Sequence, residues 1–135
     1  MLFRSPEAPA AGSAPQPVGP AVAALDFDAL VDTFLGQRAT VIDLLGRFIA
    51  KTRTQLAEIE ASITAQDAKS VREAAHSIKG AAWNLSAKPL GDAAKELEAA
   101  GRDGDLEAAL RLLEPLGARM AEFEAAAAPF IKDSD

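Results

Sequence analysis

Several residue types are absent or scarce in this chain of 135 residues, and each absence excludes a class of site. There is no cysteine, which removes disulfides, thiolate nucleophiles and cysteine-rich zinc sites, and fits a reducing compartment. The single histidine, His76, excludes a metal site built from several histidines. Tyrosine is absent and tryptophan occurs once, so little aromatic surface is available for stacking a cofactor or single-stranded nucleic acid.

Positive charge and long apolar runs are also scarce. Fourteen Lys and Arg against twenty Asp and Glu give a net charge of −6, which argues against nucleic acid as a partner because its phosphates require a basic surface. No apolar stretch is long enough to span a bilayer, and the N-terminus lacks the pattern of a signal peptide. We therefore expect a cytoplasmic protein with no membrane contact.

Prolines are concentrated at the start of the chain. Five of the eight lie within residues 1–24, among Ala, Gly and Ser. This composition cannot bury an apolar face or hold a helix, so we expect residues 1–24 to be a flexible leader or linker. With hydrophobic residues making up 49% of the chain, residues 25–132 have enough apolar material for one helical domain.

That domain has the apolar periodicity of helices throughout. A short first helix is expected to end near Gly36, and a long amphipathic helix to run from about Arg38 to Thr64. The histidine helix follows over 67–86, with Asp67 as its N-cap. A fourth helix starts at Pro89 and closes at Gly101, and a fifth follows the Gly104-Asp105 turn.

Four long amphipathic helices joined by short polar turns predict an all-α fold, an antiparallel up-down four-helix bundle. The additional short N-terminal helix is expected to act as a lid. Pro115 should kink or break the last helix, because proline removes a backbone donor and clashes with the preceding turn. Since such a bundle can close on its own, we expect a monomer, although an exposed Trp83 leaves a weak dimer open.

His76 is expected to face solvent, because it points away from the apolar stripe of its own helix. That stripe consists of Val71, Ala75, Ile78, Ala82 and Leu85. At 100° per residue, the residues within roughly 60° of His76 on the other side are Arg72, Lys79, Gly80 and Trp83. Such a surface suits contact with an anion or a partner protein better than it suits packing.

The residue types around His76 suit chemistry on a phosphoryl group. A neutral imidazole nitrogen is a good nucleophile near neutral pH, but on a convex helix a partner must bring the rest of the site. Lys79 and Arg72 can stabilise negative charge there. Inside a helix, Gly80 lowers helix stability by about 1 kcal/mol relative to alanine. Clearance for an approaching partner would be a functional reason to keep it. Trp83 offers a large exposed group for a protein contact.

Each of these residues also has a plain structural interpretation. His76, Lys79 and Arg72 can be ordinary solvated side chains. Gly80 can relieve crowding against a neighbouring helix, and Trp83 can fold over the edge of the bundle as an extension of the core. The coincidence of all five on one face favours a functional surface.

The stretch 71–98 resembles the histidine-containing phosphotransfer (HPt) domain of bacterial two-component phosphorelays. The similarity centres on Ala75-His76-Ser77-Ile78-Lys79-Gly80-Ala81-Ala82-Trp83-Asn84-Leu85-Ser86 and ends with Leu97-Glu98. It extends more loosely over 26–123, through the order of the helices and the lengths of the loops. Two residues depart from the family pattern, since Ser86 replaces the usual glycine and Trp83 a residue that is commonly small.

The resemblance implies a phosphorelay intermediate. His76 would accept a phosphoryl group on Nε2 from a receiver-domain aspartyl phosphate and pass it to an aspartate of another response regulator. By the same analogy Lys79 assists electrostatically and Gly80 admits the receiver's loops. The residues expected to contact the partner are Arg72, Ser77 and Trp83.

The implied protein is a phosphocarrier rather than an enzyme. The sequence has no Gly-rich phosphate loop or nucleotide-binding signature, so no direct use of ATP is expected. No carboxylate cluster is expected near His76, so the receiver should supply Mg²⁺ and the chain should have no cofactor of its own. The expected partners are receiver domains and a hybrid or ordinary histidine kinase.

Two other functions remain open from the sequence. The first is a non-catalytic helical module that binds a receiver or a histidine kinase without accepting phosphate. The second is the dimerisation and phosphoacceptor domain of a histidine kinase. That domain is disfavoured because it carries an acidic residue directly after the histidine, where this chain has Ser77, and because it dimerises through two-helix hairpins.

Overall fold

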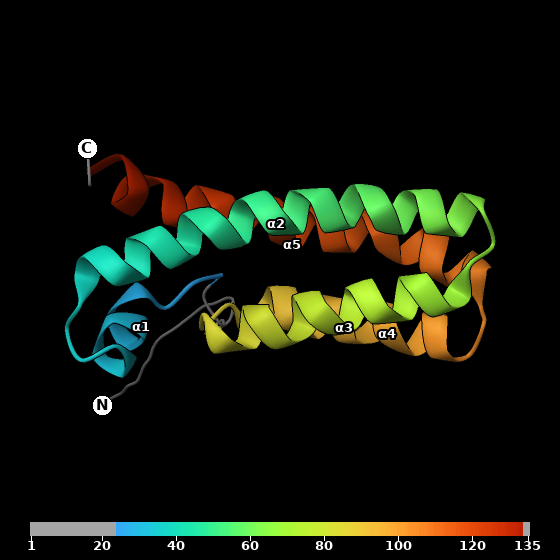
Figure 1. Ribbon diagram of the computed structural model, residues 1–135, viewed down its shortest axis with the longest axis horizontal. Coiled ribbons are helices and arrows are strands. Elements are labelled where there is room, and N and C mark those ends of the chain that lie inside the picture. Colours follow the sequence, from blue (N-terminus) through green and yellow to red (C-terminus); the bar gives the residue numbers. More distant parts are fainter. Residues whose placement is uncertain (1–23, 134–135) are drawn as a thin grey trace, which may run out of the picture.

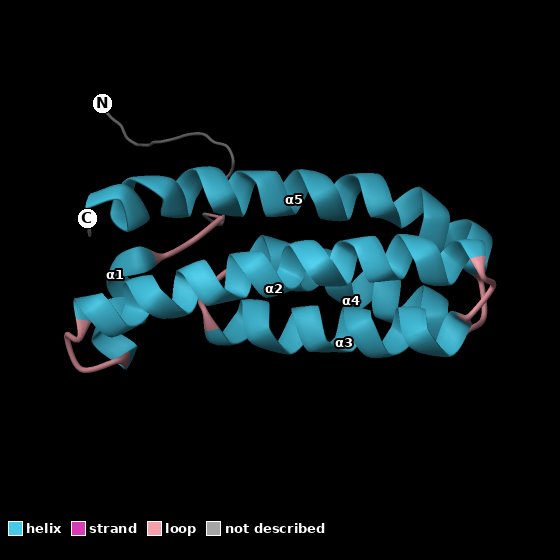
Figure 2. Cartoon of the chain, turned by 45° about the horizontal axis from the view of Figure 1, so that its top comes forward, coloured by secondary structure: helices cyan, strands magenta, loops and turns pink. Residues whose placement is uncertain are grey.

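A computed structural model of the chain describes residues 24–133, in which every regular element is a helix (Figures 1 and 2). The five helices are α1 (Phe27–Thr33), α2 (Arg38–Thr64), α3 (Ala68–Asn84), α4 (Lys88–Arg102) and α5 (Leu106–Asp133). The predicted leader lies outside the described residues, apart from Ala24. No helix in the described part is long and apolar enough to cross a membrane.

The four long helices form the predicted up-down bundle. Helix α2 packs against α3 and α5, and α4 packs against the same two helices, so each long helix has two neighbours (Figure 1). Short turns join successive helices at alternate ends, which makes neighbours antiparallel. The fold class and the extra N-terminal helix are therefore confirmed.

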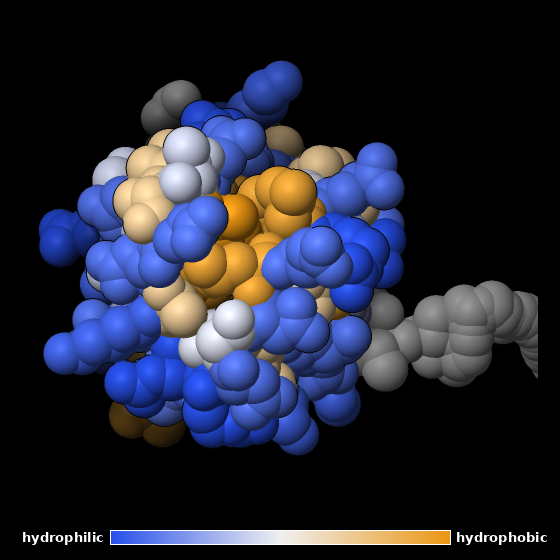
Figure 3. All heavy atoms as spheres, turned by 90° about the vertical axis from the view of Figure 1, so that its right-hand side faces the viewer, coloured by the Kyte–Doolittle hydropathy of each residue, from blue (hydrophilic) through white to orange (hydrophobic). Residues whose placement is uncertain are grey.

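Helix α1 covers one end of the core. Leu30 is fully buried, and the Phe27 ring stacks on Phe130 of α5 with 3.8 Å between the ring centroids. The Asp26 N–H donates to the Ser86 carbonyl at 3.3 Å, which ties the start of α1 to the turn after α3. At the opposite end of the bundle, hydrophobic residues are visible at the centre of the face with hydrophilic residues around them (Figure 3).

The apolar stripe of α3 lies in the core as predicted. Four of its five residues are fully buried and the fifth is nearly so; they are Val71, Ala75, Ile78, Ala82 and Leu85. Burial of this stripe fixes the rotation of α3 about its own axis, because the hydrophobic contribution of each buried side chain is lost if the helix turns. The opposite side of α3 therefore faces outward.

The helix ends follow from local hydrogen bonds. The predicted cap is confirmed, since Asp67 Oδ1 accepts the N–H of Ser70 at 3.1 Å, and Asp105 likewise caps α5 by accepting the N–H of Ala108 at 3.0 Å. After α3, Ser86 adopts a left-handed φ of 60° and the next N–H donates to the Ala82 carbonyl at 2.8 Å. This is a Schellman turn, which explains why glycine is usual at that position.

Pro115 was expected to kink or break the last helix. Helix α5 is not broken at Pro115 but runs on as one helix, and the bend in its N-terminal part in Figure 2 agrees with the expected kink. Pro115 lies on the exposed side, so its missing hydrogen bond is at the water-facing surface, while Leu116 and Phe123 hold the other side in the core. Helix α4 was expected to close at Gly101 and ends one residue later, at Arg102.

Candidate functional site

Helices α3 and α4 approach each other closely at the site because Gly101 has no side chain. A Cβ atom at Gly101 would lie 2.8 Å from the backbone nitrogen of Arg72 and 3.1 Å from the carbonyl oxygen of Ala68. These are backbone atoms, which cannot swing aside. The glycine therefore sets the distance between the two helices one turn away from His76.

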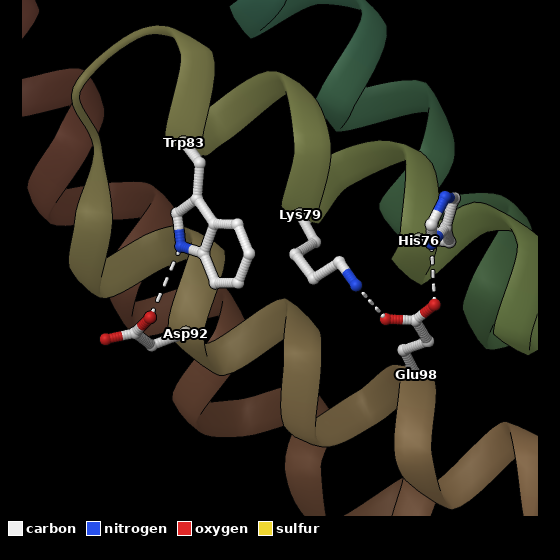
Figure 4. Close-up of polar contacts among 5 residues, drawn as sticks. All are labelled: His76, Lys79, Trp83, Asp92 and Glu98. Atoms are coloured by element: carbon white, nitrogen blue, oxygen red, sulfur yellow. Dashed lines mark hydrogen bonds and ion pairs between the residues drawn. The ribbon is translucent and has the colours of Figure 1, made fainter.

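This close approach brings Glu98 of α4 to His76 of α3 (Figure 4). Glu98 Oε2 lies 2.6 Å from His76 Nδ1, while the other ring nitrogen points away from the carboxylate. The His76 side chain is 66% exposed, so the imidazole faces solvent as the apolar stripe predicts. The ring is thus held on one edge and open on the other.

Lys79 contacts the same carboxylate. Its Nζ lies 2.6 Å from Glu98 Oε1, so one carboxylate bridges the imidazole and the ammonium group. The hydrogen bond from Lys79, and after it the one with His76, holds the pKa of the Glu98 carboxyl below its ordinary value, against the opposing effect of burial. Glu98 is therefore ionised at neutral pH.

An ionised Glu98 determines which nitrogen of His76 carries the proton. A carboxylate can only accept hydrogen bonds, so the short contact requires a proton on Nδ1. In the neutral imidazole the lone pair then belongs to Nε2, on the exposed edge of the ring. The arrangement leaves the nucleophilic nitrogen on the solvent-exposed side of the ring.

Sequence reasoning missed Glu98 as a site residue. Glu98 was quoted only as part of the resemblance to the family, and no role beside His76 was assigned to it. The signal was available in the spacing, because His76 and Glu98 each lie eleven residues from Ala87, in the turn between two antiparallel helices. Residues at equal distances from the middle of a helical hairpin come side by side.

Gly80 lies on α3 one turn beyond His76, and nothing in the described structure requires a glycine there. A Cβ atom at this position would meet no atom within 4 Å. The crowding explanation is therefore wrong, since a larger residue would point into open space. No contact within the described residues thus accounts for a glycine, a residue that weakens its own helix.

Trp83 lies on the same side of α3 but is folded onto α4. Its Nε1 donates a hydrogen bond to Asp92 Oδ1 at 3.2 Å, and the indole occupies the space that a side chain at Gly91 would fill. The side chain remains 42% exposed. Trp83 thus extends the packing of the bundle, as one interpretation of the sequence proposed, and still reaches the surface.

The other two expected contact residues lie differently. Arg72 is half-buried on α3, beside Gly101. Ser77 points toward α2, where its Oγ accepts a hydrogen bond from Gln55 Nε2 at 2.9 Å. The structure therefore does not bring Ser77 together with His76, Lys79 and Glu98.

An open, mainly apolar groove of about 340 Å³ lies between α2 and α3. Its lining includes Ala81, next to Gly80, and the cations Arg47 and Lys51. The groove thus lies on the side of α3 that faces α2 and includes none of the residues around His76. Within residues 24–133, no group of three or more His, Asp or Glu residues is arranged to hold a metal ion.

Comparisons with known proteins identify the family of the chain. Residues 43–126 match the family model of the Hpt domain. The chain is also similar to the crystal structure of histidine-containing phosphotransfer protein B (HptB) from Pseudomonas aeruginosa PAO1, with a TM-score of 0.75 and 28% sequence identity over 82% of this chain and 96% of that one. A comparison with curated proteins gives no match.

The family match covers more than half of the chain, and it includes His76, Lys79, Gly80 and Glu98. Members of this family are phosphocarriers rather than enzymes in the ordinary sense, and they interact with receiver domains and kinases. The chain belongs to the Hpt domain family and is a histidine phosphotransfer protein of two-component signalling.

Proposed function

We propose that the chain is a phosphorelay intermediate that carries its phosphoryl group on Nε2 of His76. It accepts the group from an aspartyl phosphate of one receiver domain and passes it to an aspartate of another response regulator. The observation that supports this most is the contact of Glu98 with Nδ1, which leaves Nε2 exposed with the lone pair.

The reacting groups in the transfer step are the exposed nitrogen and the partner's aspartyl phosphate. The Nε2 lone pair attacks phosphorus, an N–P bond forms, and the P–O bond to the receiver aspartate breaks as its carboxylate leaves with the electron pair. Nδ1 keeps its proton, so the ring becomes positively charged. The Glu98 carboxylate at 2.6 Å stabilises that charge, and the second receiver aspartate reverses the step.

The cations beside His76 support the phosphoryl group. Lys79 lies three residues after the histidine on the same face of α3, and Arg72 lies four residues before it. Their charges favour the negative oxygens of a group on Nε2. Lys79 is already positioned through Glu98, whereas Arg72, with Trp83 and Ser77, is proposed as a partner contact.

The receiver is proposed to dock across the open surface at Gly80. A Cβ atom there would meet no described atom within 4 Å, and the mainly apolar groove between α2 and α3, whose lining includes Arg47 and Lys51, offers a second contact area. Burial of such apolar area gives a docked partner its affinity, and docking brings the reacting atoms into line. The receiver supplies the Mg²⁺ in this scheme.

Transfer of labelled phosphate tests the proposal. A receiver domain phosphorylated with labelled phosphate is mixed with the wild-type chain or with His76→Gln, which keeps a polar side chain of similar size. Label should move to the wild type only. Equal labelling of both proteins would contradict the proposal, and binding of the receiver without labelling of the wild type would favour the non-catalytic module.

A further inference from the structure

The indole of Trp83 has one defined place beside the His76 surface. Its Nε1 donates a hydrogen bond to Asp92. A Cβ atom at Gly91 would lie 2.2 Å from the indole Cδ1 and 2.3 Å from Nε1. Any residue other than glycine at this position would push the ring off α4. The pairing is specific, because Trp83 and Gly91 each lie four residues from Ala87 and so face each other across the hairpin.

The fixed ring lies beside the Lys79 ammonium (Figure 4). Lys79 Nζ is 5.6 Å from the centroid of the Trp83 ring, within the range of a cation–π interaction, and 2.6 Å from Glu98. Only 20% of the Lys79 side chain is exposed, whereas Lys88, which pairs with Asp92 on the same surface, is 62% exposed. Lys79 is therefore enclosed between a ring and a carboxylate, where reduced solvation strengthens both attractions.

We propose that Trp83 is a positioning residue that holds the Lys79 ammonium against Glu98, and through Glu98 fixes the imidazole of His76. An exposed lysine on a flexible four-carbon chain keeps an ion pair only weakly, because ordering the chain costs entropy. The ring removes part of that freedom by covering the lysine. The effect on phosphotransfer rests on the proposed function, whereas the effect on Lys79 and Glu98 does not.

Titration of the Glu98 carboxyl by NMR, on the unphosphorylated full-length chain, tests the positioning directly. Trp83→Leu, which keeps an apolar side chain but no ring, should raise the Glu98 pKa toward its ordinary value, in the direction of Lys79→Ala. Trp83→Phe should raise it less, because a ring face remains. A wild-type Glu98 pKa in Trp83→Leu, or equal rises in the leucine and phenylalanine variants, would overturn the proposal.

Gly91→Ala provides a matched test that leaves Trp83 in the chain. The new methyl should displace the indole and raise the Glu98 pKa. In the Trp83→Leu background the same change should add almost nothing, because no indole remains to be displaced. An equal rise of the Glu98 pKa in both backgrounds would contradict the positioning role of Trp83. If Trp83→Leu did not fold, the Glu98 pKa of Gly91→Ala alone would test that role.

Phosphotransfer gives the functional readout. Trp83→Leu should slow transfer from a labelled receiver by about two- to five-fold, the range expected for a cation–π contact at a partly exposed site. Failure of the two proposals can be told apart. If His76→Gln were labelled as strongly as the wild type, the proposed function would be contradicted, but the titration of Glu98 would still be valid. If the Glu98 pKa were unchanged in Trp83→Leu, the positioning role of Trp83 would be contradicted, whatever the labelling result.

Discussion

Gly80 and Gly101 lie on the two helices that form the same surface, but they are glycine for different reasons. A Cβ atom at Gly101 would strike the backbone of α3 at 2.8 Å, whereas one at Gly80 would meet nothing within 4 Å. Gly101 is therefore explained by packing inside the chain. No packing contact explains Gly80, and its cost in helix stability fits the clearance proposed above for a docking receiver.

The difference shows how the two halves of the site are made. The α4 half is internal: Gly101 lets the helices approach, and that approach lets Glu98 reach His76. The α3 half is open, with the exposed imidazole and Gly80 next to it. A substitution at Gly101 should therefore be seen mainly in stability, and a substitution at Gly80 mainly in transfer.

Gly80→Glu should have the largest effect, and it should be on transfer. The new side chain has room within the chain but obstructs a docking partner with bulk and negative charge. We expect at least a tenfold slower transfer of labelled phosphate, about 1.4 kcal/mol, with a melting temperature within a few degrees of the wild type. Unchanged transfer would show that Gly80 provides no clearance.

Gly101→Ala should affect stability instead. The added methyl must push α3 and α4 apart, and overpacking of this kind costs about 1–3 kcal/mol. Thermal or denaturant unfolding should show the loss, with Gly80→Ala as the matched control, because that change should stabilise α3 by up to about 1 kcal/mol. Equal effects of the two alanines would remove the distinction between the glycines.

Ser86→Gly extends the comparison of the glycines to a position whose backbone conformation favours glycine but which carries serine. Ser86 has a left-handed φ of 60°, which costs a residue with a side chain about 1 kcal/mol or more. Glycine should therefore raise the unfolding free energy by about 1 kcal/mol or less, since it also loosens the unfolded chain. A drop in melting temperature would show that the serine side chain stabilises the turn.

The smallest effect should be the pH dependence that Glu98 contributes. Its pKa is lowered in the folded state, first by the hydrogen bond from Lys79, so its stabilising contribution is present above the unfolded pKa of about 4.3 and is lost as pH falls through the folded value. Solvent screening keeps it modest. Glu98→Gln should make the melting temperature fall less between neutral pH and pH about 3; an identical fall in both proteins would contradict the Glu98 assignment.

The apolar periodicity of the sequence was sufficient to predict the helices and the outward direction of His76. The buried stripe of α3 and the Asp67 cap depend on neighbours a few residues away, so they could be predicted from local pattern. The Glu98 contact depends on how two helices pair, which a helical wheel of one helix does not contain. The equal spacing of His76 and Glu98 from Ala87, in the turn of the hairpin, would have predicted this contact.

Two alternatives that the sequence left open are decided in the same way. Pro115 was expected to kink or break α5, and the helix bends without breaking because the proline lies on the exposed side. Trp83 could be placed on the His76 side of α3, but its fold onto α4 required the space left by Gly91. Both outcomes are decided by contacts between helices rather than by the local sequence.

The ring nitrogen that carries the phosphoryl group tests the central claim most directly. The chain is labelled with ¹⁵N, phosphorylated by a receiver domain, and its single imidazole is observed by NMR, which distinguishes phosphate on Nε2 from phosphate on Nδ1. The account predicts phosphate on Nε2 of His76, with Nδ1 still protonated and bonded to Glu98. Phosphate on Nδ1 would contradict this account. So would a phosphorylated chain whose imidazole carries no phosphate.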